Sequence, residues 1–258
     1  MSAAKLIQSP ANAAFRRWES LLESRGIRRH GRFLLAGRKL VPEALANWPR
    51  RFEAILRPET EDESGLPAAS GMDSYRLARP LFDRLDVSGT GFPLLVGRLP
   101  DMPAVDLTQP PQGLELVAGL GDPVNLGALL RSAAAFGVAR LILLEEAAHP
   151  FHPRCLRAAA NAPFRLSISR GATWADLAGA AGPLHALDLT GEDLRHFHWP
   201  RHLRLVLGEE GLGLPRGLQA TRLSIPTSGR VESLNATVAA SLALYGWFIA
   251  WGGEAPAR

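Results

Sequence analysis

The stretch "NLGALLRSAAAFG", residues 125–137, decides how the second half of this chain is interpreted. Apolar residues recur in it at the spacing of one helix face, and a final glycine suits the end of a helix. These residues are Leu126, Leu129, Leu130, Ala133, Ala134, Phe136 and Gly137. Asn125 and Arg131 stand out because a plain amphipathic helix needs neither. Taken singly, each has an ordinary alternative: a helix cap for Asn125 and a solvated surface residue for Arg131.

Two glycine-bearing loops follow further along the chain. They read "VLGEEGLGLP" at 206–215 and "IPTSGRVESLNATVAA" at 225–240. The polar residues that draw attention there are Glu210, Ser233 and Asn235. Each again has an ordinary alternative, a surface charge for Glu210 and caps of the last helix for the other two.

The chain between and around these stretches alternates buried-type strands with helices. Strands are expected at 114–120, 139–145, 165–169, 184–189, 203–208 and 222–226, with helices at 125–137, 173–180 and 235–250. Continuous apolar strands alternating with helices predict a parallel sheet covered on both faces. The first half is expected to hold helices at 5–25 and 38–47, strands at 32–37, 51–57 and 92–99, and a polar loop at 58–72. A Pro-rich stretch separates the halves, so the predicted domains are 1–99 and 113–258, joined by a linker at 100–112.

Composition and charge restrict the class of protein. The 258 residues are 47% hydrophobic, carry a formal net charge of +4 and include one cysteine, Cys155. A single cysteine excludes an intramolecular disulfide and fits a cytoplasmic protein. Arginine and lysine are concentrated in the first 57 residues, as expected for a phosphate-backbone partner, although an Arg-rich solvated surface is the alternative. The candidate RNA-binding residues are Arg28, Arg29, Arg32, Arg38 and Lys39.

Several other classes fit poorly. A dinucleotide fingerprint beginning at Gly119 would need glycine where Val124 stands, and the chain contains no P-loop, so a nucleotide-dependent oxidoreductase is disfavoured. The histidine-rich segments 149–152 and 196–202 lack the spacing of a metal site. The uncharged segment 236–253 approaches the length of a membrane span, but its small and polar residues favour a buried or dimer-interface helix.

Taken together and in order, the three motifs closely resemble the TrmH-type branch of the SPOUT superfamily of RNA methyltransferases. The resemblance covers residues 113–250. The segment from Ile7 to Leu45 is also similar to the substrate-binding domain that often precedes this catalytic domain. The resemblance implies an α/β fold whose parallel sheet ends in a deep trefoil knot, a smaller N-terminal α/β RNA-binding domain, and a homodimer with pockets near its interface.

The resemblance also implies the site. Catalytic positions match Asn125, Arg131, Glu210, Ser233 and Asn235. Backbone groups lining the pocket for S-adenosyl-L-methionine match Leu207, Gly208, Gly211, Ile225, Pro226 and Leu234. Where the family often has a glycine, this chain has Asn161, a residue type that tolerates positive φ better than most.

Physical chemistry supports a metal-free mechanism at these residues. A ribose 2′-hydroxyl must lose its proton as it attacks the methyl carbon, and a fixed guanidinium can stabilise the developing oxyanion. The resemblance therefore implies methyl transfer to a ribose 2′-oxygen of structured RNA. Because the N-terminal segment resembles that of the ribosomal-RNA members of the family, large-subunit ribosomal RNA is the favoured substrate and tRNA the other one. The alternative is a non-catalytic RNA-binding module that retains the fold.

Overall fold

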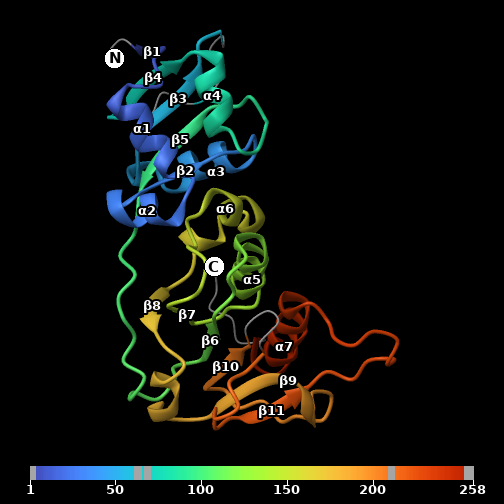
Figure 1. Cartoon of the computed structure of the whole chain (residues 1–258). Coiled ribbons are helices and arrows are strands. Elements are labelled where there is room, and N and C mark those ends of the chain that lie inside the picture. Colours follow the sequence, from blue (N-terminus) through green and yellow to red (C-terminus); the bar gives the residue numbers. More distant parts are fainter. Residues whose placement is uncertain (1–3, 61–65, 67–70, 209–212, 253–258) are drawn as a thin grey trace. The chain divides into compact units, whose positions relative to one another are not determined.

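The computed structural model describes residues 4–60, 66, 71–208 and 213–252. The chain forms two compact units, which are described separately (Figure 1). The first comprises Met1–Asp101 and His149–Asn161, and the second Met102–Ala148 and Ala162–Arg258.

The first unit is built on a mixed five-stranded sheet in the order β1-β4-β3-β5-β2. Its strands are β1 (Lys5–Ile7), β2 (Arg32–Leu35), β3 (Phe52–Pro58), β4 (Asp73–Leu77) and β5 (Leu94–Arg98). Its helices are α1 (Ala13–Ser20), α2 (Ser24–His30), α3 (Leu40–Asn47), α4 (Arg79–Leu85) and α6 (Pro153–Ala159), with a 3₁₀ turn η1 (Pro49–Arg51). β1, β3 and β4 run parallel, whereas β5 pairs antiparallel with β2 and β3. The unit is therefore α/β, as predicted.

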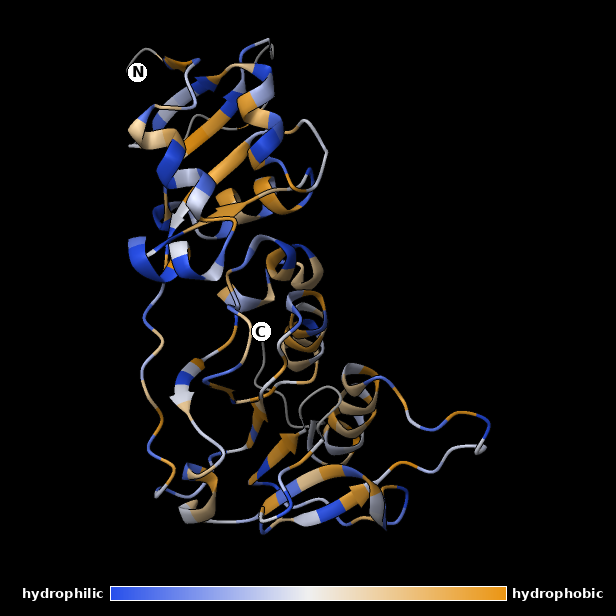
Figure 2. Ribbon diagram, viewed as in Figure 1, coloured by the Kyte–Doolittle hydropathy of each residue, from blue (hydrophilic) through white to orange (hydrophobic). Residues whose placement is uncertain are grey.

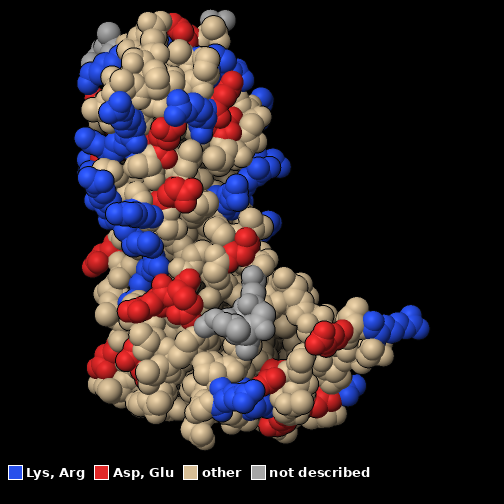
Figure 3. All heavy atoms as spheres, viewed as in Figure 1, with Lys and Arg blue, Asp and Glu red and all other residues tan. Residues whose placement is uncertain are grey.

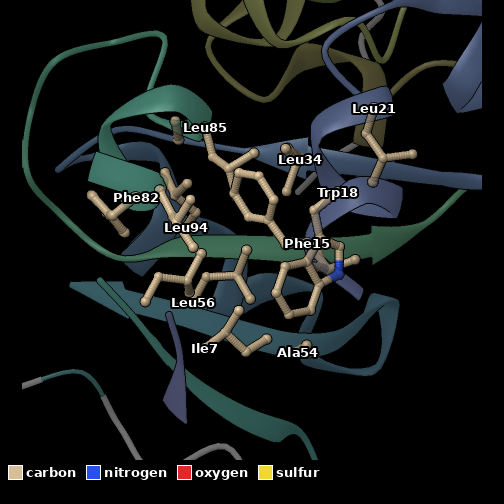
Figure 4. Close-up of a cluster of buried hydrophobic side chains, with 14 of the residues drawn as sticks. Ile7, Phe15, Trp18, Leu21, Leu34, Ala54, Leu56, Phe82, Leu85 and Leu94 are labelled. Atoms are coloured by element: carbon tan, nitrogen blue, oxygen red, sulfur yellow. The ribbon is translucent and has the colours of Figure 1, made fainter. Parts of the chain in front are cut away.

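The core of this unit lies between the sheet and α1, α2 and α4. Phe15 and Trp18 of α1 pack against Leu56 and Leu94 of the sheet in one buried cluster (Figure 4). The prediction of one helix over 5–25 is wrong. Pro10 separates β1 from α1, and the Asn12 side chain caps α1 by accepting hydrogen bonds from the backbone amides of Ala14 and Phe15.

A segment from the second half of the sequence belongs to this first unit. The Phe151 ring lies 5.0 Å from the Phe33 ring, and the side-chain amide of Asn161 donates to the Leu40 carbonyl at 3.1 Å. Asn161 has a φ of +62°, which confirms that asparagine adopts the left-handed turn expected there. Residues 149–161 therefore pack with the first unit, although the sequence-based boundaries include them in 113–258. That residues 1–99 and 113–258 act as separate functional domains remains a prediction.

The second unit contains a six-stranded sheet in the order β11-β9-β10-β6-β7-β8. Its strands are β6 (Leu114–Ala118), β7 (Arg140–Leu144), β8 (Ile168–Ala172), β9 (Leu184–Asp193), β10 (Leu203–Leu207) and β11 (Thr221–Ser224). Its helices are α5 (Pro123–Ala135) and α7 (Ala236–Trp251), with 3₁₀ turns η2 (Ala162–Phe164) and η3 (Asp176–Gly179). Every pairing in the sheet is parallel, as predicted.

Both faces of this sheet are covered. On one face, Val117, Ile142 and Val206 pack with Leu107 and with Leu177 of η3. The residues that alternate with them on β6, β7 and β10 are equally buried. Figure 2 shows the central strands β6 and β10 in hydrophobic colours. The helix predicted at 173–180 is only the short turn η3.

The segment predicted as a linker is attached to the second unit. Arg204 of β10 is 1% exposed and donates to the backbone carbonyls of Leu107 and Gln109. Its guanidinium also pairs with the Glu115 carboxylate at 2.9 Å. The hydrogen bonds to the two carbonyls hold the segment against the sheet. The buried ion pair keeps the Arg204 charge compensated, since removing one partner would leave an uncompensated charge.

Helices α5 and α7 pack against each other through small polar contacts. The Thr237 hydroxyl donates to the Asn125 carbonyl at 3.1 Å, and the hydroxyls of Ser132 and Ser241 lie 2.8 Å apart. α7 is apolar around its circumference, yet no helix among the described residues is long and apolar enough to cross a membrane. The trefoil knot remains a prediction.

Candidate active site

A cavity of about 330 Å³ opens beside the middle of β9 and the ends of β10 and β11. Its lining residues come from these strands and the residues that follow β10 and β11, from the loop before α7 and from the first turn of α7. They are Leu187, Asp188, Leu189, Leu207, Gly208, Gly213, Leu214, Leu223, Ile225, Thr227, Glu232, Ser233, Leu234, Ala236 and Ala239. A concave, mostly apolar cavity with a few polar groups, at the carboxyl edge of a parallel sheet, is the usual form of a small-molecule site.

Glycine is required at Gly208 by the chain itself. A Cβ atom there would lie 2.7 Å from the backbone carbonyl carbon of Gly213, closer than real Cβ contacts allow. Gly213 itself has a φ of +71°, which favours glycine. The two glycines therefore let the backbone at residues 208 and 213 approach closely beside the cavity.

One wall of the cavity is held by an ion pair. The Asp188 carboxylate of β9 accepts a hydrogen bond from the Arg222 guanidinium of β11 at 3.0 Å. Its other oxygen accepts from the backbone amide of Leu189 at 2.7 Å, while Arg222 also donates to the Leu218 carbonyl. These contacts fix the part of β9 that borders the cavity.

The third motif supplies both the cavity wall and the start of α7. Ser233 and Leu234 line the cavity, and Asn235 caps α7. The Asn235 side-chain oxygen accepts from the backbone amides of Thr237 at 2.9 Å and Val238 at 3.3 Å. The capping explanation for Asn235 is therefore confirmed, and its side-chain amide nitrogen is not used by the cap.

The first motif lies on α5, which Asp122 caps in place of the suggested Asn125. Asn125 contacts the first turn of α7 through its backbone carbonyl. Six residues separate it from Arg131, about 9 Å along the helix axis and about 120° around it. Arg131 is exposed, and its side chain makes no ion pair or hydrogen bond with another described residue.

Within one chain the structure assembles only part of the predicted site. Four predicted cofactor residues line the cavity: Leu207, Gly208, Ile225 and Leu234. Ser233 is the one predicted catalytic residue that does so among those described. Pro226, Asn125, Arg131 and Asn235 are outside the lining, and Glu210 and Gly211 lie outside the described residues.

Sequence reasoning missed two acidic residues of the lining, Asp188 and Glu232. The positions of these two residues in the sequence could have indicated them. Asp188 follows the apolar run of a parallel strand, where ligand-binding residues gather, and Glu232 directly precedes Ser233 in the third motif.

The candidate RNA-binding residues differ in their surroundings. Arg28 and Arg29 are exposed on the last turn of α2. Lys39 is also exposed, whereas the Arg38 guanidinium donates to the Thr90 carbonyl at 2.9 Å. Figure 3 shows Lys and Arg side chains gathered along the edge of the first unit where α1 and α2 lie.

Arg32 is already paired with an acid. Its guanidinium lies 2.6 Å from the Glu53 carboxylate, which also contacts Arg98 at 3.1 Å. Burial acts to raise the pKa of Glu53, but the hydrogen bonds and charges of Arg32 and Arg98 outweigh it and lower that pKa. Arg32 therefore carries less free positive charge than Arg28 and Arg29.

Two histidines in the second half, His185 and His202, have structural contacts. The His202 ring accepts from the backbone amide of Gly113 at 2.7 Å, and the His185 ring packs 5.0 Å from that of Phe197. Among the described residues, no three His, Cys, Asp or Glu side chains group as metal ligands do.

Comparison with known proteins gives a family match. The model of the family described as "SpoU rRNA Methylase family" matches residues 116–245, half of the chain. This range contains α5, the strands β7 to β11, both glycine-bearing loops and most of α7.

Three curated relatives extend the similarity over more of the chain. "Ribosomal RNA small subunit methyltransferase G 2" of Syntrophobacter fumaroxidans is 39% identical over 93% of this chain, but the chain spans only 48% of that protein. "23S rRNA (guanosine(2553)-2'-O)-methyltransferase RlmP" of Bacillus subtilis is 29% identical over 93% of this chain and 98% of its own length. "23S rRNA (uridine(2479)-2'-O)-methyltransferase" of Streptomyces viridochromogenes is 31% identical over 91% of this chain and 88% of its own length.

A solved structure agrees in fold along nearly the whole chain. The SpoU methyltransferase AviRb from Streptomyces viridochromogenes, in complex with the cofactor AdoMet, superposes with a TM-score of 0.76 at 25% identity. The match covers 92% of this chain and 97% of that one.

Proposed function

This chain belongs to the SpoU rRNA methylase family, and from this premise we propose that it transfers a methyl group from S-adenosyl-L-methionine to a ribose 2′-hydroxyl of structured RNA. One observation carries the proposal. Both glycine-bearing motif loops, 206–215 and 225–240, contribute residues to a single cavity of about 330 Å³.

The cavity fits the cofactor. Its volume falls within the usual range for small-molecule sites, about 300–1,000 Å³. Leucine, isoleucine and alanine side chains line it, and a Cβ at Gly208 would collide with the backbone of Gly213, another residue of the lining. Leu207, Gly208, Ile225 and Leu234 would hold the adenosyl group. When bound, S-adenosyl-L-methionine supplies a methyl group on a positively charged sulfur.

Arg131 stabilises charge in this proposal and does not accept the proton. A guanidinium stays protonated at any working pH, so it is a poor base, but it can hold an adjacent phosphate and the oxyanion that forms on the 2′-oxygen. Asn125, Ser233 and Asn235 orient the hydroxyl with their polar side chains. Glu210 remains a proposed member of the site through the family motif.

We further propose that the working form is a homodimer. In one chain Arg131 lies outside the cavity lining, on an exposed face of α5. The neighbouring face of α7 is exposed and apolar, with Val238, Leu242, Tyr245 and Ile249 spaced as one helix stripe. A second copy covering this stripe would bury it and bring a second Arg131 to the interface.

Light scattering tests the dimer. The wild-type chain is expected at twice its monomer mass, and Leu242→Glu at the monomer mass with lost methyl transfer. Val87→Glu, which places the same charge on an exposed residue of the first unit, is the matched control and keeps the dimer. A monomeric, fully active wild type would contradict the homodimer.

Ribosomal RNA of the large subunit is the proposed substrate, with the cytoplasm as the place of action. Two relatives that match over most of their own length carry names that specify 23S rRNA 2′-O-methylation, one at a guanosine and one at a uridine. The exposed basic residues of the first unit would contact the phosphate backbone.

Mapping of 2′-O-methyl groups in ribosomal RNA from a deletion strain tests the substrate and identifies the nucleotide. The proposal predicts one methyl group missing in 23S rRNA and restored by the wild-type gene. If all 2′-O-methyl groups are present in 23S rRNA and one is missing from tRNA, the substrate is tRNA and not 23S rRNA. An unchanged pattern in both RNAs would favour a non-catalytic RNA-binding protein.

A further inference from the structure

The ionisable side chains in the described part of the cavity lining are of one sign. Asp188 and Glu232 are the acidic residues in its lining, and no lysine, arginine or histidine belongs to the described part of that lining. The cavity wall formed by these residues is therefore negative unless the acids are compensated from outside.

The two acids differ in this respect. Asp188 is compensated, because Arg222 pairs with it at 3.0 Å and the Leu189 amide holds its other oxygen. Glu232 makes no ion pair or hydrogen bond with the residues that the structure describes. Its carboxylate therefore contributes the uncompensated charge of the described wall.

Building on the proposed function, we propose that Glu232 makes the cavity select the sulfonium cofactor over its neutral-sulfur product. In the reaction the carbon–sulfur bond breaks with its electron pair on sulfur, the methyl carbon bonds to the 2′-oxygen, and the hydroxyl proton passes to water. S-adenosylhomocysteine, the product, therefore carries one positive charge fewer than S-adenosyl-L-methionine. A fixed negative charge attracts the first ligand more than the second.

The effect is modest in size and sensitive to salt. Glu232 is exposed, so water weakens its field and dissolved ions screen it. For a partly solvated charge a few ångströms from the ligand, the preference is expected to be about three- to tenfold. The expected consequence of this preference is weaker product inhibition. S-adenosylhomocysteine has a neutral sulfur that the Glu232 carboxylate does not attract, so it leaves the cavity more readily.

Isothermal titration calorimetry of the full-length protein with each ligand tests this inference without measuring turnover. For Glu232→Gln, the affinity ratio of S-adenosyl-L-methionine to S-adenosylhomocysteine is expected to fall at least threefold. Raising the salt concentration is expected to lower the wild-type ratio and leave the variant ratio unchanged. Glu192→Gln, which removes an exposed carboxylate of β9 outside the cavity lining, is the matched control and keeps the wild-type ratio.

The outcomes separate this inference from the proposed function. A ratio that falls less than threefold overturns the role of Glu232, including the case in which both ligands weaken equally through the ammonium group that they share. A wild type that binds neither ligand overturns the cofactor assignment and this inference together. Thermal melts of both variants verify that the fold is retained.

Discussion

At the residue scale, substitution of Arg131 is expected to change methyl transfer without changing the stability of the fold. It is exposed on α5, has no described partner and lies outside the cavity lining. Arg131→Ala is therefore expected to fold normally and bind S-adenosyl-L-methionine as wild type does. Single-turnover methyl transfer is expected to fall by about 10²-fold or more, the usual loss when one oxyanion-stabilising donor is removed.

Arg131→Lys is the control for this experiment. Lysine keeps the charge but not the planar pair of donors, so activity between wild type and alanine is expected. Full activity of Arg131→Ala would contradict the electrostatic role, and a parallel loss of cofactor affinity would point to a structural one.

Asn235 has two roles that substitution can separate. Its side-chain oxygen caps α7, and its amide nitrogen is proposed to orient the hydroxyl. Asn235→Ala loses both roles, at a cost of about 1 kcal/mol in stability. Asn235→Asp keeps a capping oxygen and is expected to match wild type in thermal stability while methyl transfer falls at least tenfold. A stable, fully active Asn235→Asp would reduce Asn235 to a cap.

The sequence could indicate which residues matter here but not how they assemble. Spacing marked Asn235 as a potential cap, because it directly precedes an apolar helix. The same reasoning gave the cap of α5 to Asn125, whereas the structure uses Asp122, three residues earlier and directly before Pro123. Asp188 and Glu232 reach the cavity through tertiary packing of β9 and the loop before α7, which no local pattern records.

At the element scale, the predictable elements were those with strong local signals. The apolar runs of β6, β7 and β10 and the helices α5 and α7 were predicted, because burial on both sides leaves continuous apolar sequence. The seven-residue helices α4 and α6 and the strand β4 were missed. Such short elements depend on tertiary contacts, as in the pairing of β4 with β1 and β3.

At the same scale, His185 on β9 is expected to make the stability of the fold depend on pH. Burial lowers the pKa of His185, and the charge of Glu192 opposes this only in part. In the unfolded chain the ring takes up a proton below about pH 6.5, whereas the folded ring resists until lower pH. The free energy of unfolding should therefore decrease as pH falls from 7.5 to 5.5.

Denaturant unfolding of wild type and His185→Phe at these two pH values measures how much His185 contributes to the change in stability. Phenylalanine removes the titrating group and preserves an aromatic contact with Phe197. The variant is expected to lose less stability on acidification than wild type. An equal loss in both would show that His185 does not contribute.

At the scale of the whole molecule, the first unit does not coincide with a continuous segment of sequence. Residues 149–161 complete it, and Phe151, Cys155 and Leu156 are buried there. Deletion of residues 1–99 would expose these side chains, so loss of activity in such a truncation would not report on RNA recognition. Surface substitutions in the full chain are the sound test.

Neutralising Arg28 and Arg29 together tests the proposed RNA contact. Both are exposed, so the double alanine variant is expected to fold, to bind cofactor normally and to bind RNA more weakly. The slope of log affinity against log salt is expected to flatten by about one to two, as two phosphate contacts are lost. RNA binding is measured by filter retention across a salt series.

Arg79 and Arg84 provide the matched control. Their guanidinium groups are already paired with Asp83 and Glu19, so replacing both removes the same charge from the same unit at sites that are compensated. Wild-type RNA affinity is expected for this control. Equal weakening in the two double variants would indicate a general effect of net charge and contradict a specific role for Arg28 and Arg29.

The most direct test of the central claim is methyl transfer by the purified chain to unmodified 23S rRNA, with the methyl group of S-adenosyl-L-methionine radiolabelled. After alkaline hydrolysis, the label is predicted in alkali-resistant dinucleotides, because a 2′-O-methyl group blocks cleavage at its own ribose. Label released in mononucleotides, which marks a methylated base, or no transfer by a folded protein that binds the cofactor, would contradict it.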